Sequence, residues 1–344
     1  MSLKNDPASI VADPQWLPAR WDRQGERLQF AWIPRSGHSE VTFLGDEYLA
    51  QLQPPSATLA LSDVVAAKPP EAPSPHYIFH SAFCCSTLLA RALDVPGTAM
   101  ALKEPQILND LADAARAGQL RPDLVKLVTG LLARPFGVGE GVVIKPSNAA
   151  NLLATGVLEL DPGSNALFLY APLPRFLRSV ADKGLWGRVW VRKLFATLRG
   201  DTGLDFGYST GELLVLTDLQ LAALVWLTHH AQAAALIARL PGRVRTLDCE
   251  TFLARRAETL FAAADHFGLG LTESQSEKIA GGPAFATHSK EIGRSFDPEQ
   301  TRQPKSRVPI IDEEIEMVGG WTEALAAHAG LTMELPPEAK LLPP

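Results

Sequence analysis

The sequence predicts an α/β fold: a parallel, doubly wound sheet flanked by helices, preceded by a small N-terminal β arm. From residue 76 onward, short apolar runs alternate with longer helical patterns. The apolar runs show no polar–apolar alternation, which is typical of strands in a sheet covered on both faces. An alternation of such strands with helices along the chain indicates a parallel sheet.

The elements follow from these two patterns. The expected strands are 76–80, 99–102, 142–145, 166–171 and 243–247. The expected helices are 86–94, 105–117, 121–133, 148–154, 173–183, 187–199, 217–240, 251–267 and 311–328. Ligands of such sheets bind beyond the carboxyl ends of the strands, so the residues that follow each strand are the first candidates for a site.

The chain divides into residues 1–75, an N-terminal β arm with a Pro-rich linker, and residues 76–344, the main α/β domain. Segments 28–33 and 40–44 alternate like two antiparallel strands joined by a polar turn. The linker, 68–75, is rich in proline and alanine. We expect the arm to lie on the main domain, over a sheet edge or a cleft.

Composition narrows the class of protein. The 344 residues are 46% hydrophobic and 20% charged, with a net charge of −6 and a pI near 5.8, which gives no support for nucleic-acid binding. The three cysteines, Cys84, Cys85 and Cys249, are too few for a disulfide framework and lack zinc-site spacing. The polar N-terminus and the absence of an apolar run of roughly 18 residues lead us to expect a cytoplasmic protein without a membrane partner.

The segment 76–93 predicts an anion site. An apolar strand runs into a short loop, and Ser86 and Thr87 then open a helix whose unpaired N–H groups and dipole favour phosphate or sulfate. Aligned on Thr87, the lysine of a standard P-loop falls on Ser86, and its two glycines fall on His80 and Cys85. An ordinary ATPase or GTPase is therefore not expected, and a capped helix after a buried strand is the alternative.

Four segments, in this order, resemble the sulfotransferase family. Residues 83–89 stand where that family has its 5′-phosphosulfate loop, and 102–106 resembles the Lys/Glu segment after its second strand. Residues 143–148 followed by 166–179 resemble the strand, lysine and 3′-phosphate segment. The Leu-Asp-Cys-Glu-Thr-Phe-Leu run within 244–253 resembles the family's strand and Tyr-Glu-Asp-Leu hallmark.

The resemblance implies a P-loop nucleoside-triphosphate-hydrolase-like fold of the sulfotransferase type. It implies transfer of a sulfonate group from 3′-phosphoadenosine-5′-phosphosulfate to a hydroxyl or amine of a small-molecule acceptor, with no metal required. The sequence departs from the family pattern at three positions. The basic residue of the first loop falls on Phe83, the loop glycine on Cys85, and the 3′-phosphate arginine on Ala171.

Displacement at sulfur needs a base for the acceptor proton and cations for the leaving phosphate. Glu104 follows a strand and is the expected base, although a carboxylate there would also suit a helix start. His80 is the alternative base, or else a core histidine. Lys145 ends a strand and is the expected cation, or else a solvent lysine, with Lys103 as the second choice.

The residues expected to hold the nucleotide come from three places. Ser179, with Arg175 or Arg178 nearby, is expected at the 3′-phosphate, unless this is an ordinary amphipathic helix surface. Within the long irregular loop 283–309, Lys290 and Arg294 are expected to close over the nucleotide, or else to be solvated. The loop candidates for the 5′-phosphate are Phe83, Cys84, Cys85, Ser86 and Thr87.

Other clusters have structural interpretations. Trp186, Trp190 and Phe195 lie near helical spacing and are expected in the core or along an acceptor pocket. The pair at 229–230, two histidines, is expected on a helix surface, and Glu250 is expected to be structural.

Three hypotheses remain open. The first is a sulfotransferase, and the second is a catalytically degenerate relative that binds a nucleotide or a protein. The third is an atypical P-loop kinase, which the missing lysine and the lack of an aspartate for Mg²⁺ disfavour. The tryptophan-bearing helices make a homodimer possible.

Overall fold

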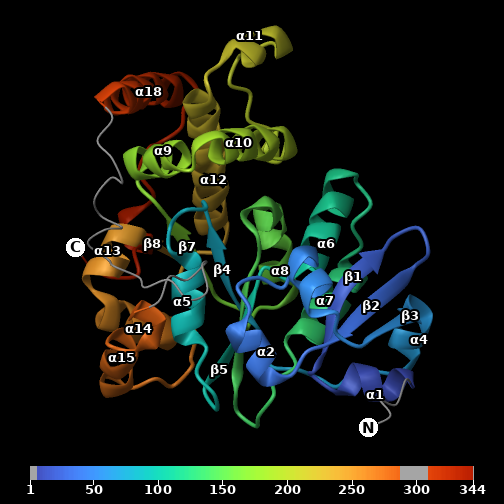
Figure 1. Cartoon of the computed structure of the whole chain (residues 1–344). Helices are drawn as coiled ribbons and strands as arrows, with labels where there is room; N and C mark the ends of the chain where they lie inside the picture. The colour runs from blue at the N-terminus through green and yellow to red at the C-terminus, as the bar shows by residue number, and fades with distance from the viewer. Residues whose placement is uncertain (1–5, 287–308, 344) are drawn as a thin grey trace.

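The computed structural model describes residues 6–286 and 309–343, and its centre is a parallel five-stranded sheet (Figure 1). The strand order is β5-β6-β4-β7-β8. The strands are β4 (His76–His80), β5 (Ala99–Lys103), β6 (Gly141–Lys145), β7 (Ala166–Tyr170) and β8 (Val244–Asp248). The chain leaves β4 toward β5 on one side and later passes β4 to reach β7 on the other, so the winding reverses at β4. The predicted fold class is confirmed.

Helices cover both faces of the sheet. One face carries Ile78, Leu167 and Leu169, and packs with the apolar faces of α5, α9, α12 and α14. The opposite face carries Phe79 and Phe168, and packs with α6, α7, α8 and the 3₁₀-helix η1. The bounds are α5 (Ser86–Leu93), α6 (Gln106–Arg116), α7 (Pro122–Leu132), η1 (Asn148–Leu153), α8 (Ala154–Leu160), α9 (Leu173–Asp182), α10 (Gly184–Leu198), α11 (Thr210–Val215), α12 (Asp218–Arg239), α13 (Cys249–Ala254), α14 (Arg256–His266), α15 (Glu273–Ala280), α16 (Pro283–Ala286), α18 (Pro309–His328) and η2 (Pro337–Ala339).

The main-domain predictions agree with the structure to within one residue for the strands. Two predicted helices differ from the structure in their type or continuity. Segment 148–154 is a 3₁₀-helix rather than an α-helix, and 251–267 is divided into α13 and α14 at Arg255, whose backbone leaves the helical region. The short helices α8, α11, α15 and α16 were not predicted, because their apolar patterns are too short to show a helical period.

The N-terminal residues form a three-stranded antiparallel sheet with four short helices. The prediction for 28–33 is confirmed by β2, but the prediction of a strand at 40–44 is wrong. A helix, α2, ends at Glu40, and 41–44 is a loop in which Val41 and Leu44 are buried. The bounds are α1 (Pro7–Ala12), β1 (Trp16–Asp22), β2 (Arg27–Trp32), α2 (Arg35–Glu40), α3 (Asp46–Leu52), β3 (Ser56–Ala60) and α4 (Leu61–Ala66).

This N-terminal unit shares a core with the main domain. Leu28 and Phe30 of β2 are buried in the same hydrophobic cluster as Leu111 of α6 and Leu131 of α7. The Nε group of Arg20 in β1 lies 2.9 Å from a carboxylate oxygen of Asp110 in α6. The unit is therefore part of the layer on that face of the sheet.

Both edge strands of the main sheet are covered by other segments of the chain. At β5, the Leu44 N–H donates to the Lys103 carbonyl at 2.7 Å, and an Arg35 guanidinium N–H donates to the Ala99 carbonyl at 3.1 Å. At β8, the Leu341 N–H donates to the Thr246 carbonyl at 2.9 Å. The N-terminal unit thus lies over one sheet edge.

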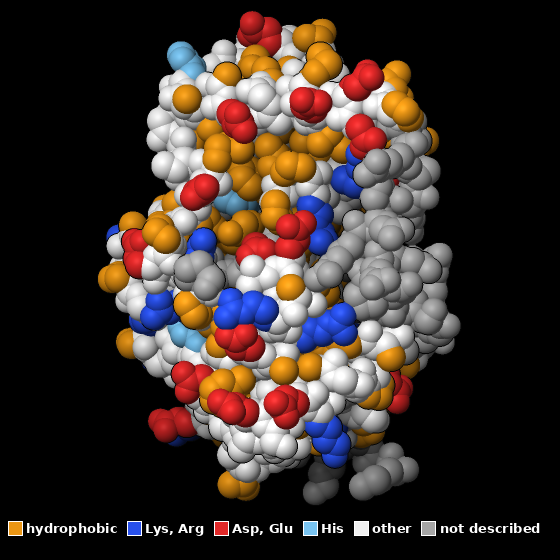
Figure 2. Space-filling view, turned by 90° about the vertical axis from the view of Figure 1, so that its left-hand side faces the viewer, with side chains coloured by type: hydrophobic (Ala, Val, Ile, Leu, Met, Phe, Trp, Pro, Cys, Tyr) orange, Lys and Arg blue, Asp and Glu red, His pale blue; other side chains and the backbone are white. Residues whose placement is uncertain are grey.

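Hydrophobic side chains are not confined to the core. Figure 2 shows them gathered in a hollow at the height of α9, α12 and α18, and Met317 of α18 is 76% exposed. Trp186 of α10 is 60% exposed, so the expectation that it lies in the core is wrong. Helix α12 is long and apolar enough to cross a membrane, but 72% of its apolar window is buried within the protein, as in a core helix.

The side chain of Arg134 joins the N-terminal unit to the main domain. It is 3% exposed and donates to the carbonyls of Leu131, Ile10 and Val11 at 2.7, 3.0 and 2.8 Å, and also to Asp13 and Trp16. Replacing it by methionine removes all of these side-chain donors at once.

We expect Arg134→Met to lower the free energy of unfolding by about 3 kcal/mol, because hydrogen bonds from a buried charged group are lost. Urea denaturation monitored by circular dichroism measures the change. The exposed Arg23→Met is the matched control and should leave the midpoint unchanged. Equal stability of the two variants would contradict the joining role of Arg134.

Candidate active site at the carboxyl ends of β4, β5 and β6

The three predicted catalytic side chains meet at one edge of the sheet. His80 is the last residue of β4, Lys145 the last of β6, and Glu104 follows β5. The Glu104 carboxylate contacts the Lys145 ammonium, and its Oε1 lies 3.9 Å from His80 Nε2. Strands β4 and β6 are paired only at His76 and Tyr77, so they separate toward these ends. The sequence predicted this convergence from the strand ends alone.

Lys145 is fully buried. Its ammonium group contacts Glu104 and lies 5.5 Å from the centre of the Phe43 ring. An aromatic ring and a carboxylate both stabilise a cation that has lost its water. Phe43 comes from the loop after α2, and no pattern in the sequence connected it with a strand end 100 positions away. The alternative of a solvent lysine is therefore wrong for Lys145.

Lys103 lies beside Lys145, because these two residues pair across β5 and β6. It is also fully buried, and its ammonium donates to the Ser39 carbonyl at 3.1 Å. Burial lowers the pKa of Lys103 to about 8. Its head group points to the N-terminal unit, so Lys145 is the lysine next to the candidate base.

His80 has both ring nitrogens engaged. The Ala82 N–H donates to Nδ1 at 3.0 Å, so Nε2 carries the proton and donates to the Pro146 carbonyl at 3.1 Å. In this tautomer His80 has no free lone pair for a proton. Glu104, which is 24% exposed at its side chain, is the more accessible of the two candidate bases.

The loop after β4 adopts an unusual backbone. Ala82, Phe83 and Cys85 have φ angles of 70°, 50° and 64°, in the left-handed region that glycine enters most easily. The sequence has no glycine in this loop, yet the chain folds as though it did. Backbone N–H groups in a tight turn of this kind can line a concavity that suits an anion.

Helix α5 begins directly after this loop. Its N-cap, Cys85, makes no side-chain capping hydrogen bond. Ser86 and Thr87 are both buried, and the Thr87 hydroxyl has no hydrogen-bond partner within the part of the chain that the structure describes. A buried polar group without a partner is costly, so the Thr87 hydroxyl is suited to a ligand at the start of the helix.

Phe83, Cys84 and Cys85 lie toward other parts of the protein core. The Phe83 ring packs against Phe176 and Trp190, with ring centres 5.9 and 5.0 Å apart. Burial raises the pKa of the Cys249 thiol, and the neighbouring Cys85 and Cys84 thiols add to this effect. The three cysteines of the chain thus gather beside the loop.

The residues predicted for a 3′-phosphate have protein partners. An Arg175 guanidinium nitrogen lies 3.6 Å from a Glu250 carboxylate oxygen, and Arg178 is paired with Asp312. The Ser179 hydroxyl donates to the carbonyl of Arg175, one turn earlier in α9, at 2.9 Å. The structure does not bring these side chains into contact with the cluster around Glu104. Lys290 and Arg294 lie outside the described residues.

The prediction that His229 and His230 lie on a helix surface is wrong, since they are 0% and 2% exposed. The Asn148 amide donates to His229 Nε2 at 3.3 Å, and His229 Nδ1 donates to Gln232 Oε1 at 3.2 Å. The Asn151 amide donates to the His80 carbonyl at 3.0 Å, so this network borders the candidate site. The one sequence signal for this buried network was the pair of asparagines, Asn148 and Asn151, in the segment that follows β6.

No group of three or more His, Cys, Asp or Glu side chains within 6–286 and 309–343 is arranged to hold a metal ion. The candidate site itself brings together one carboxylate, one buried ammonium, a helix N-terminus and hydroxyls.

Comparisons with known proteins give structural likenesses only. No protein-family model and no curated protein matches the chain. A sulfotransferase domain from the curacin biosynthetic pathway is 15% identical, with a TM-score of 0.43 over 78% of this chain and 100% of that one. The sulfotransferase domain of the Synechococcus PCC 7002 olefin synthase is 15% identical, with a TM-score of 0.37 over 78% and 98%. At this similarity the function has to be inferred from the residues of the site.

The buried histidines predict sensitivity to acid. Burial lowers the pKa of His229 to about 4, below the ordinary value of 6.5, because the neutral ring is favoured in the folded state. The unfolded chain then binds more protons between these two values, so stability falls as the pH falls from 6.5 toward 4. His229 alone contributes up to about 1.4 kcal/mol per pH unit to this loss.

We expect His229→Gln to reduce the slope of unfolding free energy against pH between 4 and 6.5 by about one proton's contribution. Urea denaturation at a series of pH values measures it. The exposed His328→Gln is the matched control and should keep the slope of the wild type. An unchanged slope in His229→Gln would show that His229 is protonated in the folded state.

Proposed function

We propose that the protein transfers a sulfonate group from 3′-phosphoadenosine-5′-phosphosulfate to a hydroxyl or amine of a small molecule. The observation that carries this proposal is the meeting of Glu104 and Lys145 beside the loop that precedes α5. The resemblance of 83–89 and 102–106 to the sulfotransferase family implies the same two functions, phosphosulfate binding and proton abstraction, for these segments, and so supports the proposal. The proposal therefore has a chemical and a sequence basis.

The residues expected around the 5′-phosphosulfate of such a nucleotide are suited to bind an anion. The start of α5 offers N–H groups, the Thr87 hydroxyl is buried without a partner among the described residues, and Lys145 supplies a positive charge. When bound, the phosphosulfate would supply the sulfonate group and a phosphate as leaving group. Lys145 and the first turn of α5 would hold the negative charge of that phosphate.

Glu104 is suited to take the proton of the acceptor. Its carboxylate contacts the Lys145 ammonium and its side chain is 24% exposed, so an acceptor can reach it. Its φ angle of 55° and the 2.6 Å bond from its N–H to the Lys145 carbonyl fix the carboxylate at the strand ends. The buried Lys145 keeps its position because β6 and the Phe43 ring enclose it.

Nucleotide binding without sulfonate transfer is a second candidate, and two observations favour it. The Glu104 carboxylate already pairs with the Lys145 ammonium, which leaves less positive charge for a bound phosphate. Arg175 and Arg178, the expected 3′-phosphate ligands, are paired with Glu250 and Asp312. A protein that binds a nucleotide weakly, or binds a simpler anion, would have the same features.

The test is calorimetric titration of 3′-phosphoadenosine-5′-phosphate into the wild type, Lys145→Met and Thr87→Val. We expect a Kd in the micromolar range, about −8 kcal/mol. Lys145→Met loses a charge and Thr87→Val a donor, so each should weaken binding about tenfold or more. Thr87→Val removes a hydroxyl without a described partner, so its unfolding midpoint should not decrease.

The matched control is Thr259→Val in α14, where another buried hydroxyl has no partner among the described residues. It should bind as the wild type does. No binding by the wild type at millimolar nucleotide would refute sulfonate transfer from this donor and leave only the binding of another anion. Binding without transfer from the phosphosulfate to a panel of phenols, amines and alcohols would favour the second.

A further inference from the structure

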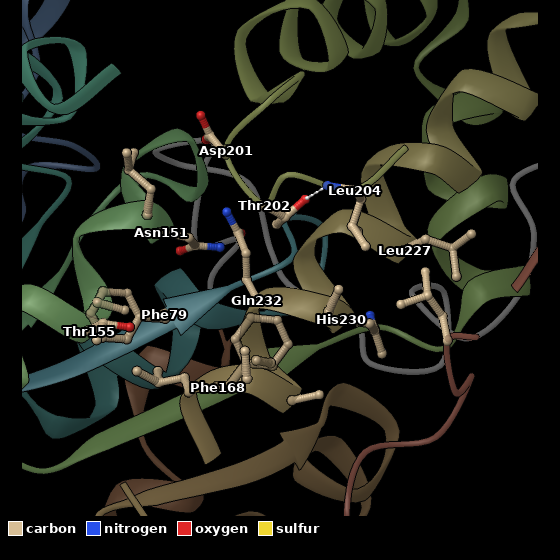
Figure 3. A pocket seen from close by; sticks show the side chains of 18 of the residues that line it. Phe79, Asn151, Thr155, Phe168, Asp201, Thr202, Leu204, Leu227, His230 and Gln232 are labelled. Atoms are coloured by element: carbon tan, nitrogen blue, oxygen red, sulfur yellow. Dashed lines mark hydrogen bonds between the residues drawn. The ribbon is translucent and has the colours of Figure 1, made fainter. Parts of the chain in front are cut away.

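A cavity lies near the candidate active site, on the sheet face that carries Phe79 and Phe168 (Figure 3). Its volume is about 530 Å³, within the range that holds a drug-sized molecule. It is lined by side chains from β4, β7, η1 and α12, and by the segments around Thr202 and Leu331. No residue of the loop 80–87 lines it, and neither do Glu104 and Lys145. It is therefore distinct from the proposed anion site.

Three polar atoms in the wall of this cavity are buried without a hydrogen-bond partner among the described residues. They are Asn151 Oδ1, Gln232 Nε2 and His230 Nε2. Figure 3 shows the amides of Asn151 and Gln232 close together, with the Phe168 ring below them. Both amides also lie within 3.2 Å of His229 Nδ1, which confirms that they meet.

Each of these three side chains makes a hydrogen bond through its other polar atom, and that bond determines whether the unpaired atom is a donor or an acceptor. Gln232 Oε1 accepts from His229, so the amide of Gln232 presents its N–H donors. Asn151 donates to the His80 carbonyl, so its oxygen remains as an acceptor. His230 Nδ1 donates to the Trp226 carbonyl at 3.1 Å, so its Nε2 is an acceptor. The cavity thus presents one donor group and two acceptors.

The rest of the wall is apolar or neutral. Phe79, Phe168 and Leu227 provide hydrophobic surface. Among the described lining residues the one carboxylate, Asp201, is paired with Arg116 at 2.7 Å. Burial lowers the pKa of His230 to about 3, so the ring is neutral at physiological pH. An anion would find no unpaired cation here and a cation no unpaired carboxylate.

We propose that this cavity binds an uncharged, largely apolar small molecule whose head group carries both hydrogen-bond donors and an acceptor, such as a carboxamide or a hydroxyl. The head group bonds Asn151 and Gln232, and the apolar body lies against Phe79 and Phe168. Asn151 Oδ1 and Gln232 Nε2, two buried polar atoms without a hydrogen-bond partner among the described residues, are then satisfied by the ligand. The proposal does not depend on sulfonate transfer, since its site and its test involve no nucleotide.

The experiment is calorimetric titration of the full-length protein with 2-naphthamide and 2-naphthol, and with 2-naphthoate as the charged analogue. We expect a Kd below 1 mM for at least one neutral probe and at least tenfold weaker binding of 2-naphthoate. In Gln232→Leu, which removes the donor, the neutral probe should bind at least tenfold more weakly. Gln51→Leu, on the exposed surface of α3, is the matched control and should bind as the wild type does.

Gln232→Leu also removes the acceptor for His229, so thermal unfolding is followed for each variant. If Gln232→Leu is unfolded, Gln232→Glu replaces it, because it keeps the oxygen that accepts from His229 and loses the N–H donors. Three results would overturn the proposal: no binding of either neutral probe at 1 mM, equal binding by the wild type and a folded Gln232 variant, or preferred binding of 2-naphthoate.

Discussion

Two adjacent strands that end in buried lysines impose the main constraint on this structure. Lys103 and Lys145 pair across β5 and β6, and both ammonium groups are removed from water. A buried charge is tolerated only with partners. Lys145 obtains them from Glu104 and the Phe43 ring, and Lys103 from the Ser39 carbonyl. Two of these three partners belong to the N-terminal unit, so its position against the sheet and the form of the candidate site have one physical cause.

Much of the main sheet could be predicted because each of its five strands in the described part of the chain is a continuous apolar run, as buried parallel strands are. The alternation at 40–44 was misleading, since a loop that inserts Val41 and Leu44 into the protein produces the same pattern as a half-buried strand. Only one backbone hydrogen bond joins the Leu44 N–H to β5, and no sequence rule foretells such a contact. The third strand, Ser56–Ala60, is too short and too small in its side chains to stand out.

The candidate site was predictable where a residue follows a strand directly, as Glu104 and Lys145 do. It was not predictable where a distant segment supplies the contact, as Phe43 does. His229 was misassigned because a polar residue in a helix suggests solvent exposure, and the asparagine that donates to its Nε2, Asn148, comes from η1. Packing between elements, rather than local pattern, decides those cases. The left-handed backbone at Phe83 is similarly a product of tertiary structure, since the residue type itself disfavours it.

The covered edges of the main sheet have a consequence for assembly. An open edge strand is a template on which another chain can add a strand. Here Leu44 and Arg35 occupy carbonyls of β5, and Leu341 occupies that of Thr246 in β8, so segments from opposite ends of the chain close the two sides. A second molecule cannot extend this sheet by strand addition without displacing them. Growth of the main sheet is thus blocked on both sides, which leaves other surfaces, such as the exposed residues of α10 and α18, for contacts with a partner.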